Sequence, residues 1–177
     1  MAETAMLTAL VYPTGEGAVI GRIAEAAQRH GLRVAGMIQK DERRPDRRRC
    51  DMSLVDLADG TEIRISEDRG KDTRGCRLDH GALEQAAFLA ARSLEATPPP
   101  DLLVLSKFGK REIEGHGFRQ VVERAVEIGV PVLVGVGNDH VEGFLAFAGE
   151  YGRVVTDAER ILAEILEDHP VDATSVA

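Results

Sequence analysis

Short, continuous apolar runs alternate along this chain with longer segments of helical periodicity. The runs LTALVY at 7–12, LRVAGMIQ at 32–39, DLLVLS at 101–106 and VPVLVGV at 130–136 have the length of strands and are mostly apolar. Strands with two apolar faces are typical of a parallel sheet that is covered by helices on both sides. The pattern therefore predicts a three-layer α/β domain built around a mainly parallel sheet.

The segments between and after these runs have the spacing and the boundaries of helices. Val19, Ile20 and Ile23 recur at helical spacing after a glycine-containing loop, and Gly31 is a helix stop signal. The predicted helices are AVIGRIAEAAQRHG at 18–31, HGALEQAAFLAARSLEA at 80–96, a segment near 117–128, and TDAERILAEILED at 156–168 with Thr156 or Asp157 as its N-cap. The segment VEGFLAFA at 141–148 fits either a helix or a strand.

The region after the second apolar run departs from simple strand and helix alternation. Residues 40–50 are polar and strongly basic, so they are predicted to form a loop. The Asp59-Gly60 pair and the alternation in TEIRIS predict an inserted β-hairpin at about 51–66. Residues 67–79 are again predicted to be a loop.

Length and charge narrow the class of protein. At 177 residues the chain is predicted to form a single α/β domain over 1–168, followed by a disordered tail at 169–177. The net charge of −8 argues against a general nucleic-acid-binding protein and favours one that handles small ligands. No apolar run has the length of a membrane span, and the N-terminus lacks the basic region of a secretory signal. We therefore expect a cytoplasmic protein.

Ligands of open α/β sheets bind beyond the carboxyl ends of the parallel strands. That rule points to the loops 13–18, 40–50, 106–116 and 136–140, and the loop 67–79 can fold over them. We expect a small anionic ligand in this place. The sequence leaves open whether the chain forms a homo-oligomer or binds a protein partner.

The loop at 13–18 stands where a phosphate-binding P-loop would stand. A P-loop reads G-x-x-x-x-G-K-[ST] between a strand and a helix. Measured from Gly15 to Gly21 the spacing is one residue too long, and Arg22 follows in place of lysine. We predict that the backbone at Gly15 and Gly17 approaches an anion without forming a working P-loop. The alternative is an ordinary turn between a strand and a helix.

A second candidate group follows the apolar run at 101–106. Nucleoside triphosphatases end the equivalent strand in an acid that holds Mg²⁺. Here Ser106 and Lys107 occupy the strand end, and Lys110 and Arg111 follow. These positive charges would repel a metal ion and attract an oxyanion, so Lys107 and Lys110 are predicted ligand-binding residues. Alternatively, they form the solvated start of a helix, where Glu112 and Glu114 partly balance their charge.

A third candidate group is the segment EDRGKDTRGCRLD. Arg69, Arg74 and Arg77 offer planar guanidinium groups that suit bidentate oxyanion contacts. Their alternative role is that of an ordinary surface loop.

The two cysteines, Cys50 and Cys76, each stand beside an arginine, which favours the reactive thiolate. We expect two unpaired thiols in or near loops, and pairing of the two in space is the alternative. The histidines show no metal-ligand spacing, so no metal site is predicted.

Five ordered segments resemble a bacterial family known as domain of unknown function 2478. They are CDMSLVDLADG, ISEDRG, RGCRLD, DLLVLSKFGKREIEGHGFR and GVPVLVGV, and the similarity runs from about residue 7 to 150. That family is similar to the small P-loop nucleoside triphosphatases, which implies a P-loop-NTPase-like topology here. Its members are often found near molybdenum transport and cofactor genes, which implies a link to molybdate or tungstate.

The departures from the nucleoside triphosphatase pattern lead to a functional hypothesis. Arg22 and Ile23 stand where lysine and a hydroxyl residue are needed, and Ser106 and Lys107 stand where acids are needed. We therefore expect a non-catalytic protein that binds molybdate, tungstate or a nucleotide phosphate. The alternatives are a nucleotide-dependent hydrolase or transferase and a regulatory interaction module in metal-cofactor metabolism.

Overall fold

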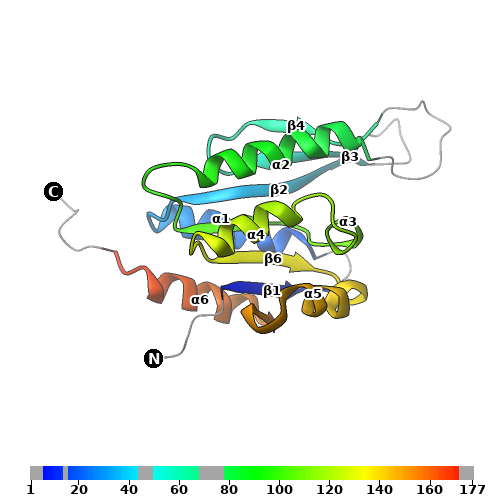
Figure 1. Ribbon diagram of the computed structural model, residues 1–177. Helices are drawn as coiled ribbons and strands as arrows, with labels where there is room; N and C mark the ends of the chain where they lie inside the picture. Colours follow the sequence, from blue (N-terminus) through cyan, green and yellow to red (C-terminus); the bar gives the residue numbers. More distant parts are fainter. Residues whose placement is uncertain (1–5, 14–15, 44–49, 68–77, 172–177) are drawn as a thin grey trace.

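A seven-stranded sheet forms the centre of the molecule, with the strand order β4-β3-β2-β5-β6-β1-β7 (Figure 1). The computed structural model describes residues 6–13, 16–43, 50–67 and 78–171. The strands are β1 (Leu7–Val11), β2 (Val34–Arg43), β3 (Cys50–Asp56), β4 (Glu62–Arg64), β5 (Leu102–Leu105), β6 (Val132–Val136) and β7 (Gly152–Val155). The helices are α1 (Ala18–Arg29), α2 (His80–Leu94), α3 (Lys110–Ile113), α4 (Arg119–Glu127), α5 (Val141–Ala148) and α6 (Ala158–Asp168), with short 3-10 turns at Asn138–His140 and Gly149–Tyr151.

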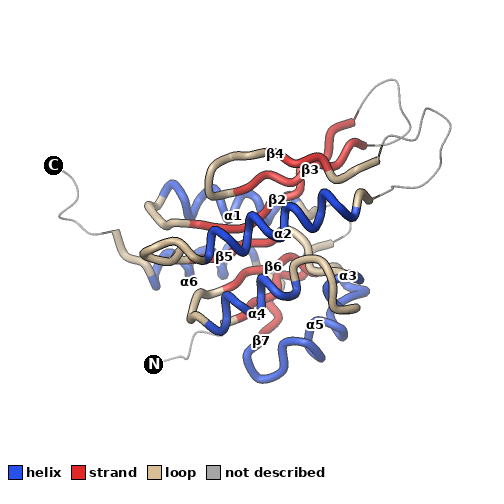
Figure 2. Tube along the Cα trace, turned by 45° about the horizontal axis from the view of Figure 1, so that its top comes forward, coloured by secondary structure: helices blue, strands red, loops and turns tan. Residues whose placement is uncertain are grey.

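Helices cover both faces of this sheet (Figures 1 and 2). On one face, α1 and α6 pack through Ile23 and Ile161 against Leu10 and Leu133 of the central strands. The other face carries α2, α4 and α5, with residues such as Phe144 buried in the larger of the two cores. The predicted three-layer α/β fold is therefore confirmed.

The pairing of the strands also agrees with the predicted mainly parallel sheet. The strands β2, β5, β6, β1 and β7 run parallel to one another, whereas β3 pairs antiparallel with β2 and with β4. The predicted hairpin is the β3–β4 pair. Its turn contains Gly60 at φ +80°, a conformation that glycine adopts without strain.

The structure corrects one local prediction and settles two segments that the sequence left open. Residues Lys40–Arg43 were predicted as part of a loop, but they continue β2, because their backbone groups pair with β3 from Lys40 opposite Ser53 to Arg43 opposite Cys50. The strand β7 was not predicted, since its four half-buried residues have no continuous apolar run. The undecided segment 141–148 is the helix α5.

An ion pair joins the starts of two neighbouring central strands. The Arg33 guanidinium donates to the Asp101 carboxylate at 3.0 Å, and each residue's backbone N–H donates to the other at 2.8 Å. The side-chain hydrogen bond from Arg33 lowers the pKa of Asp101 below its ordinary value. A carboxyl group whose pKa is lowered by folding stabilises the protein above its unfolded pKa, and this contribution is lost as the pH falls through its folded pKa.

We therefore expect Asp101→Asn to lower the free energy of unfolding by about 1 kcal/mol near neutral pH. The difference from the unchanged protein should hold down to about pH 5 and shrink below about pH 4. Urea unfolding over this pH range measures it, with the exposed Glu84→Gln as the control. A difference that persists unchanged at low pH would contradict the assigned ion pair.

Candidate ligand-binding site

The carboxyl ends of β1, β5 and β6 meet at Gly135. A Cβ atom placed on Gly135 would overlap the carbonyl oxygen of Ser106 and would lie 2.8 Å from the ring of Tyr12. The backbone N–H of Phe108 donates to the carbonyl of Gly135 at 2.8 Å. The loops that follow β1 and β5 therefore border each other at the edge of the sheet where ligands of such folds bind.

The start of α1 corrects the register of the P-loop comparison. In the P-loop pattern the second glycine directly precedes the helix that carries the lysine. Here α1 begins at Ala18 with Gly17 as its N-cap, whereas Gly21 lies inside the helix and packs near Ile38. The comparison that used Gly21 was therefore wrong. If the pattern is counted from Gly17 instead, its lysine and hydroxyl positions fall on Ala18 and Val19, whose side chains carry neither an amine nor a hydroxyl.

Tyr12 stands at the first glycine position of the corrected pattern. A Cβ atom placed on Gly17 would lie 3.4 Å from the Tyr12 ring, and one placed on Gly135 would lie 2.8 Å from it. Burial raises the pKa of the Tyr12 hydroxyl above its ordinary value. Gly15 lies outside the described residues, so its predicted role stays a prediction.

The loop after β5 holds Lys107 between two anchored neighbours. The buried hydroxyl of Ser106 accepts a hydrogen bond from the backbone N–H of Gln39 at 2.8 Å. The fully buried ring of Phe108 packs edge-on against Phe144, with ring centres 5.5 Å apart. Lys107 itself is exposed, and no ion-pair partner for it is found among the described residues. Its ammonium group is therefore available to an anion.

Glu112 fixes the rest of this loop. Its buried carboxylate accepts hydrogen bonds from the backbone N–H of Gly109 at 2.9 Å and of Phe118 at 3.3 Å. The alternative of a solvated helix start is therefore wrong for Glu112, because its side chain is buried. The signal was present as a glutamate three residues after the helix N-cap, the position from which a side chain reaches back to the cap backbone.

Two other basic residues follow Lys107. The Nζ atom of Lys110 lies 3.8 Å from Oε1 of Glu114, and both side chains are exposed to solvent. The Arg111 guanidinium lies 3.0 Å from Nδ1 of His80, the first residue of α2. Its Nε is buried and has no hydrogen-bond partner within the part of the chain that the structure describes.

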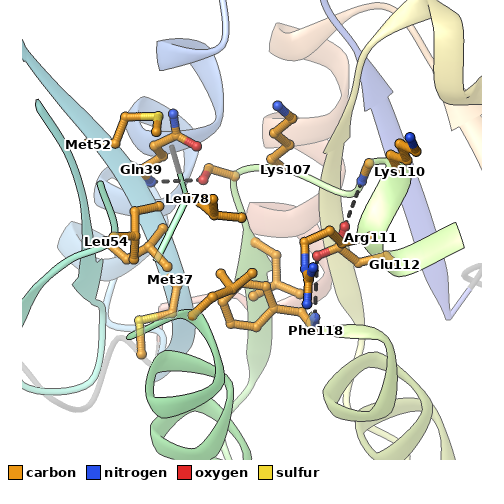
Figure 3. A pocket seen from close by; sticks show the side chains of 15 residues that line it. Met37, Gln39, Met52, Leu54, Leu78, Lys107, Lys110, Arg111, Glu112 and Phe118 are labelled. Carbon is orange, nitrogen blue, oxygen red and sulfur yellow. Dashed lines mark hydrogen bonds between the residues drawn. The ribbon is translucent and has the colours of Figure 1, made fainter. Parts of the chain in front are cut away.

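A cavity of about 340 Å³ lies beside this loop, between the strands β2 and β3 and the helix α3 (Figure 3). Met37, Met52 and Leu54 line one side, and Phe118 and Arg111 line another. Lys107 and Lys110 stand along its rim in Figure 3. The predicted residues Lys107 and Lys110 are thus brought to one cavity, and Arg111 joins them.

The remaining predicted site residues, apart from Cys50, are not placed by the structure. Arg69, Arg74, Arg77 and Cys76 lie outside the described residues. Cys50 begins β3 opposite Arg43. Among the residues described, no three His, Cys, Asp or Glu side chains form a group that could hold a metal ion. None of the helices in the described ranges is long and apolar enough to cross a membrane.

The fold belongs to the class of P-loop-NTPase-like α/β proteins. The solution structure of a human cancer-related nucleoside triphosphatase is similar with a TM-score of 0.65 and 20% identity, covering 98% of this chain and 100% of that one. The crystal structure of THEP1 from the hyperthermophile Aquifex aeolicus is similar with a TM-score of 0.61 and 17% identity. The match covers 91% of this chain and 96% of that one. At these identities the likeness shows the fold alone.

The chain belongs to the family described as Protein of unknown function (DUF2478), which matches residues 7–164. The predicted resemblance is confirmed, and this family is related to the small P-loop nucleoside triphosphatases. The chain is 28% identical over 144 residues to molybdenum import ATP-binding protein ModC 2 of Bradyrhizobium diazoefficiens, covering 81% of this chain and 16% of that protein. It is 29% identical over 120 residues to nucleoside-triphosphatase THEP1 of Methanosarcina barkeri, covering 67% of this chain and 68% of that protein.

Proposed function

We propose that this protein binds a phosphate group or a tetrahedral oxyanion on its P-loop-NTPase-like scaffold and does not hydrolyse nucleotides. The observation that carries this proposal is Lys107, which is exposed, has no ion-pair partner within the described residues and is held between anchored neighbours at the ligand edge of the sheet. The backbone of Gly15 and Gly17, the side chain of Lys110 and the side chains of Arg69, Arg74 and Arg77 complete the proposed ligand set.

The residues at the usual magnesium position do not fit that ion. A P-loop nucleoside triphosphatase holds Mg²⁺ with a hydroxyl at the helix start and an acid at the end of a neighbouring strand. Here those places hold Val19 and Ser106, and the Ser106 oxygen already accepts from Gln39. Lys107 follows directly, and its positive charge repels a cation. These substitutions support binding without phosphoryl transfer.

The choice of anion draws on one of the relatives. A protein named for molybdenum import is similar over most of this chain, although the match covers only 16% of that protein. Molybdate and tungstate are tetrahedral dianions that backbone N–H groups, lysine and arginine can hold without a metal ion. We therefore propose molybdate or tungstate, besides a nucleotide phosphate, as ligands.

Titration calorimetry with molybdate, tungstate, sulfate and ATP tests the proposal. We expect at least one of these anions to bind below about 1 mM, which corresponds to about −4 kcal/mol. Lys107→Ala should weaken that binding about tenfold, because a charge-assisted contact contributes more than 1 kcal/mol. Arg29→Ala removes the same charge from the far end of α1 and serves as the matched control. If none of the anions binds, the proposal is wrong.

The second candidate function is nucleotide hydrolysis, favoured by the relatives that are named as nucleoside triphosphatases. It requires magnesium-dependent release of phosphate from ATP or GTP. Loss of that release in Lys107→Ala would establish this function in place of the proposed one. The corrected register, with Ala18 at the lysine position, is the reason that we rank it second.

A further inference from the structure

The cavity beside the β5 loop is apolar where an inorganic oxyanion would need polar groups. Its walls include Met37, Leu54 and Phe118, which are at most 5% exposed, and the half-buried Met52. The cavity is partly open to solvent, and these apolar side chains cannot satisfy the hydrogen bonds of water, so displacing water from this wall favours an apolar ligand. Its 340 Å³ falls in the range of about 300–1,000 Å³ that is typical of small-molecule sites. The walls therefore suit the apolar body of a ligand.

The polar groups of the cavity are mostly donors. Arg111 lines the cavity, and its buried Nε lacks a partner among the described residues. Native proteins rarely leave a buried donor unpaired, so the Arg111 guanidinium retains donor capacity that no described residue uses. Lys107 adds a second positive charge at the rim, and no described residue forms an ion pair with it.

Among the described residues that line the cavity, the cations Lys107, Lys110 and Arg111 outnumber the single carboxylate of Glu112. Glu112 also lines the cavity, but both of its oxygens accept from backbone N–H groups. Glu114 pairs with Lys110 on the exposed side of α3. The cavity therefore joins an apolar wall to a net positive end, which is the complement of an organic anion.

We propose that this cavity binds a small aromatic anion, which is a ring bearing a carboxylate or a phosphate monoester. The ring lies against Met37, Met52 and Phe118, because methionine sulfur and aromatic faces make favourable contacts with rings. The anionic group accepts from Arg111 and lies near Lys107. This site shares Lys107 with the proposed oxyanion site but adds Arg111 and an apolar wall, and a carboxylate ligand needs no phosphate-binding loop.

Methyl NMR of the intact protein with ¹³C-labelled methionine tests this proposal. The chain has four methionines, of which Met37 and Met52 line the cavity. Met6 directly precedes β1, at the amino ends of the parallel strands, and does not line the cavity, so it serves as the internal control. Ring currents from bound naphthalene-2-carboxylate should shift the methyl signals of Met37 and Met52 in a saturable way and leave Met6 unchanged. Phenyl phosphate, as a second probe, distinguishes a phosphate ligand from a carboxylate ligand.

The charge requirement is tested with an uncharged ligand of the same shape. Naphthalene-2-carboxamide should bind at least tenfold more weakly than the carboxylate, and Arg111→Gln should remove that difference. Thermal unfolding checks that the variant is folded, and the comparison of the two ligands on the unchanged protein does not need the variant. Absent shifts for both charged probes, equal shifts at Met6, or equal binding of carboxylate and carboxamide would each overturn the proposal. ATP and molybdate are titrated separately. The oxyanion function can therefore fail while this site is confirmed, and this site can fail while the oxyanion function is confirmed.

Discussion

Gly36→Ala should be among the most destabilising single substitutions in this protein. Gly36 lies in β2 at φ +120°, a backbone conformation that residues with a side chain rarely adopt. A Cβ atom there would overlap the carbonyl oxygen of Val104 and lie 2.7 Å from its carbonyl carbon. The obstacle is the backbone of the neighbouring strand β5, which cannot move aside without breaking the central sheet.

The expected loss is about 3–5 kcal/mol of the free energy of unfolding, from backbone strain and overpacking together. For a chain of this length that corresponds to a fall in melting temperature of roughly 10 °C. Thermal and urea unfolding measure it. Gly137→Ala is the matched control, since a Cβ there has nothing within 4 Å and should change stability by less than about 0.5 kcal/mol. Equal stability of the two variants would contradict the assigned close approach of β2 and β5.

Glu112→Ala should be nearly as costly, and it should also disturb the ligand site. Its carboxylate is the acceptor for two backbone N–H groups, those of Gly109 and Phe118. A buried donor that loses its acceptor costs about 1–3 kcal/mol. We expect the free energy of unfolding to fall by about 2–4 kcal/mol in total. Hydrogen exchange at these two amides should become faster, because the loop that carries Lys107 and Lys110 loses the hydrogen bonds that hold it in place.

Two further variants separate the hydrogen bonds from other effects. Glu112→Gln keeps the size of the side chain and one acceptor oxygen, so it should lose about half as much stability as the alanine variant. Glu114→Ala removes an exposed carboxylate two residues away and should cost less than about 0.5 kcal/mol. Similar losses in Glu112→Ala and Glu114→Ala would show that the carboxylate of Glu112 does not brace the loop.

The sequence predicts those parts of the fold in which burial alone decides the structure. The runs around Leu10, Val104 and Val134 are apolar on both faces, so they identify central parallel strands and the edge where ligands bind. The second half of β2 was missed because its residues are polar and charged. They are strand because β3 supplies hydrogen-bonding partners, and pairing between distant segments leaves no local signal.

The site was predicted in part for a similar reason. Lys107 was found because it follows a recognisable strand, whereas the register of the glycine loop depends on where α1 begins, and Gly17 and Gly21 look alike in sequence. Arg111 was part of the basic group expected after this strand, but its position on a cavity wall is visible only in the structure. The apolar side of that cavity combines residues of three elements, for example Met37, Met52 and Phe118, and no single segment reveals it.

The central claim, phosphate binding without hydrolysis, is tested most directly by following the fate of bound ATP. ATP with Mg²⁺ is incubated with an excess of the protein, and bound and free nucleotide are separated and quantified. We expect ATP to be recovered intact from the bound fraction, with less of it bound by Lys107→Ala. Conversion of the bound ATP to ADP, lost in Lys107→Ala, would contradict the claim and identify a nucleoside triphosphatase.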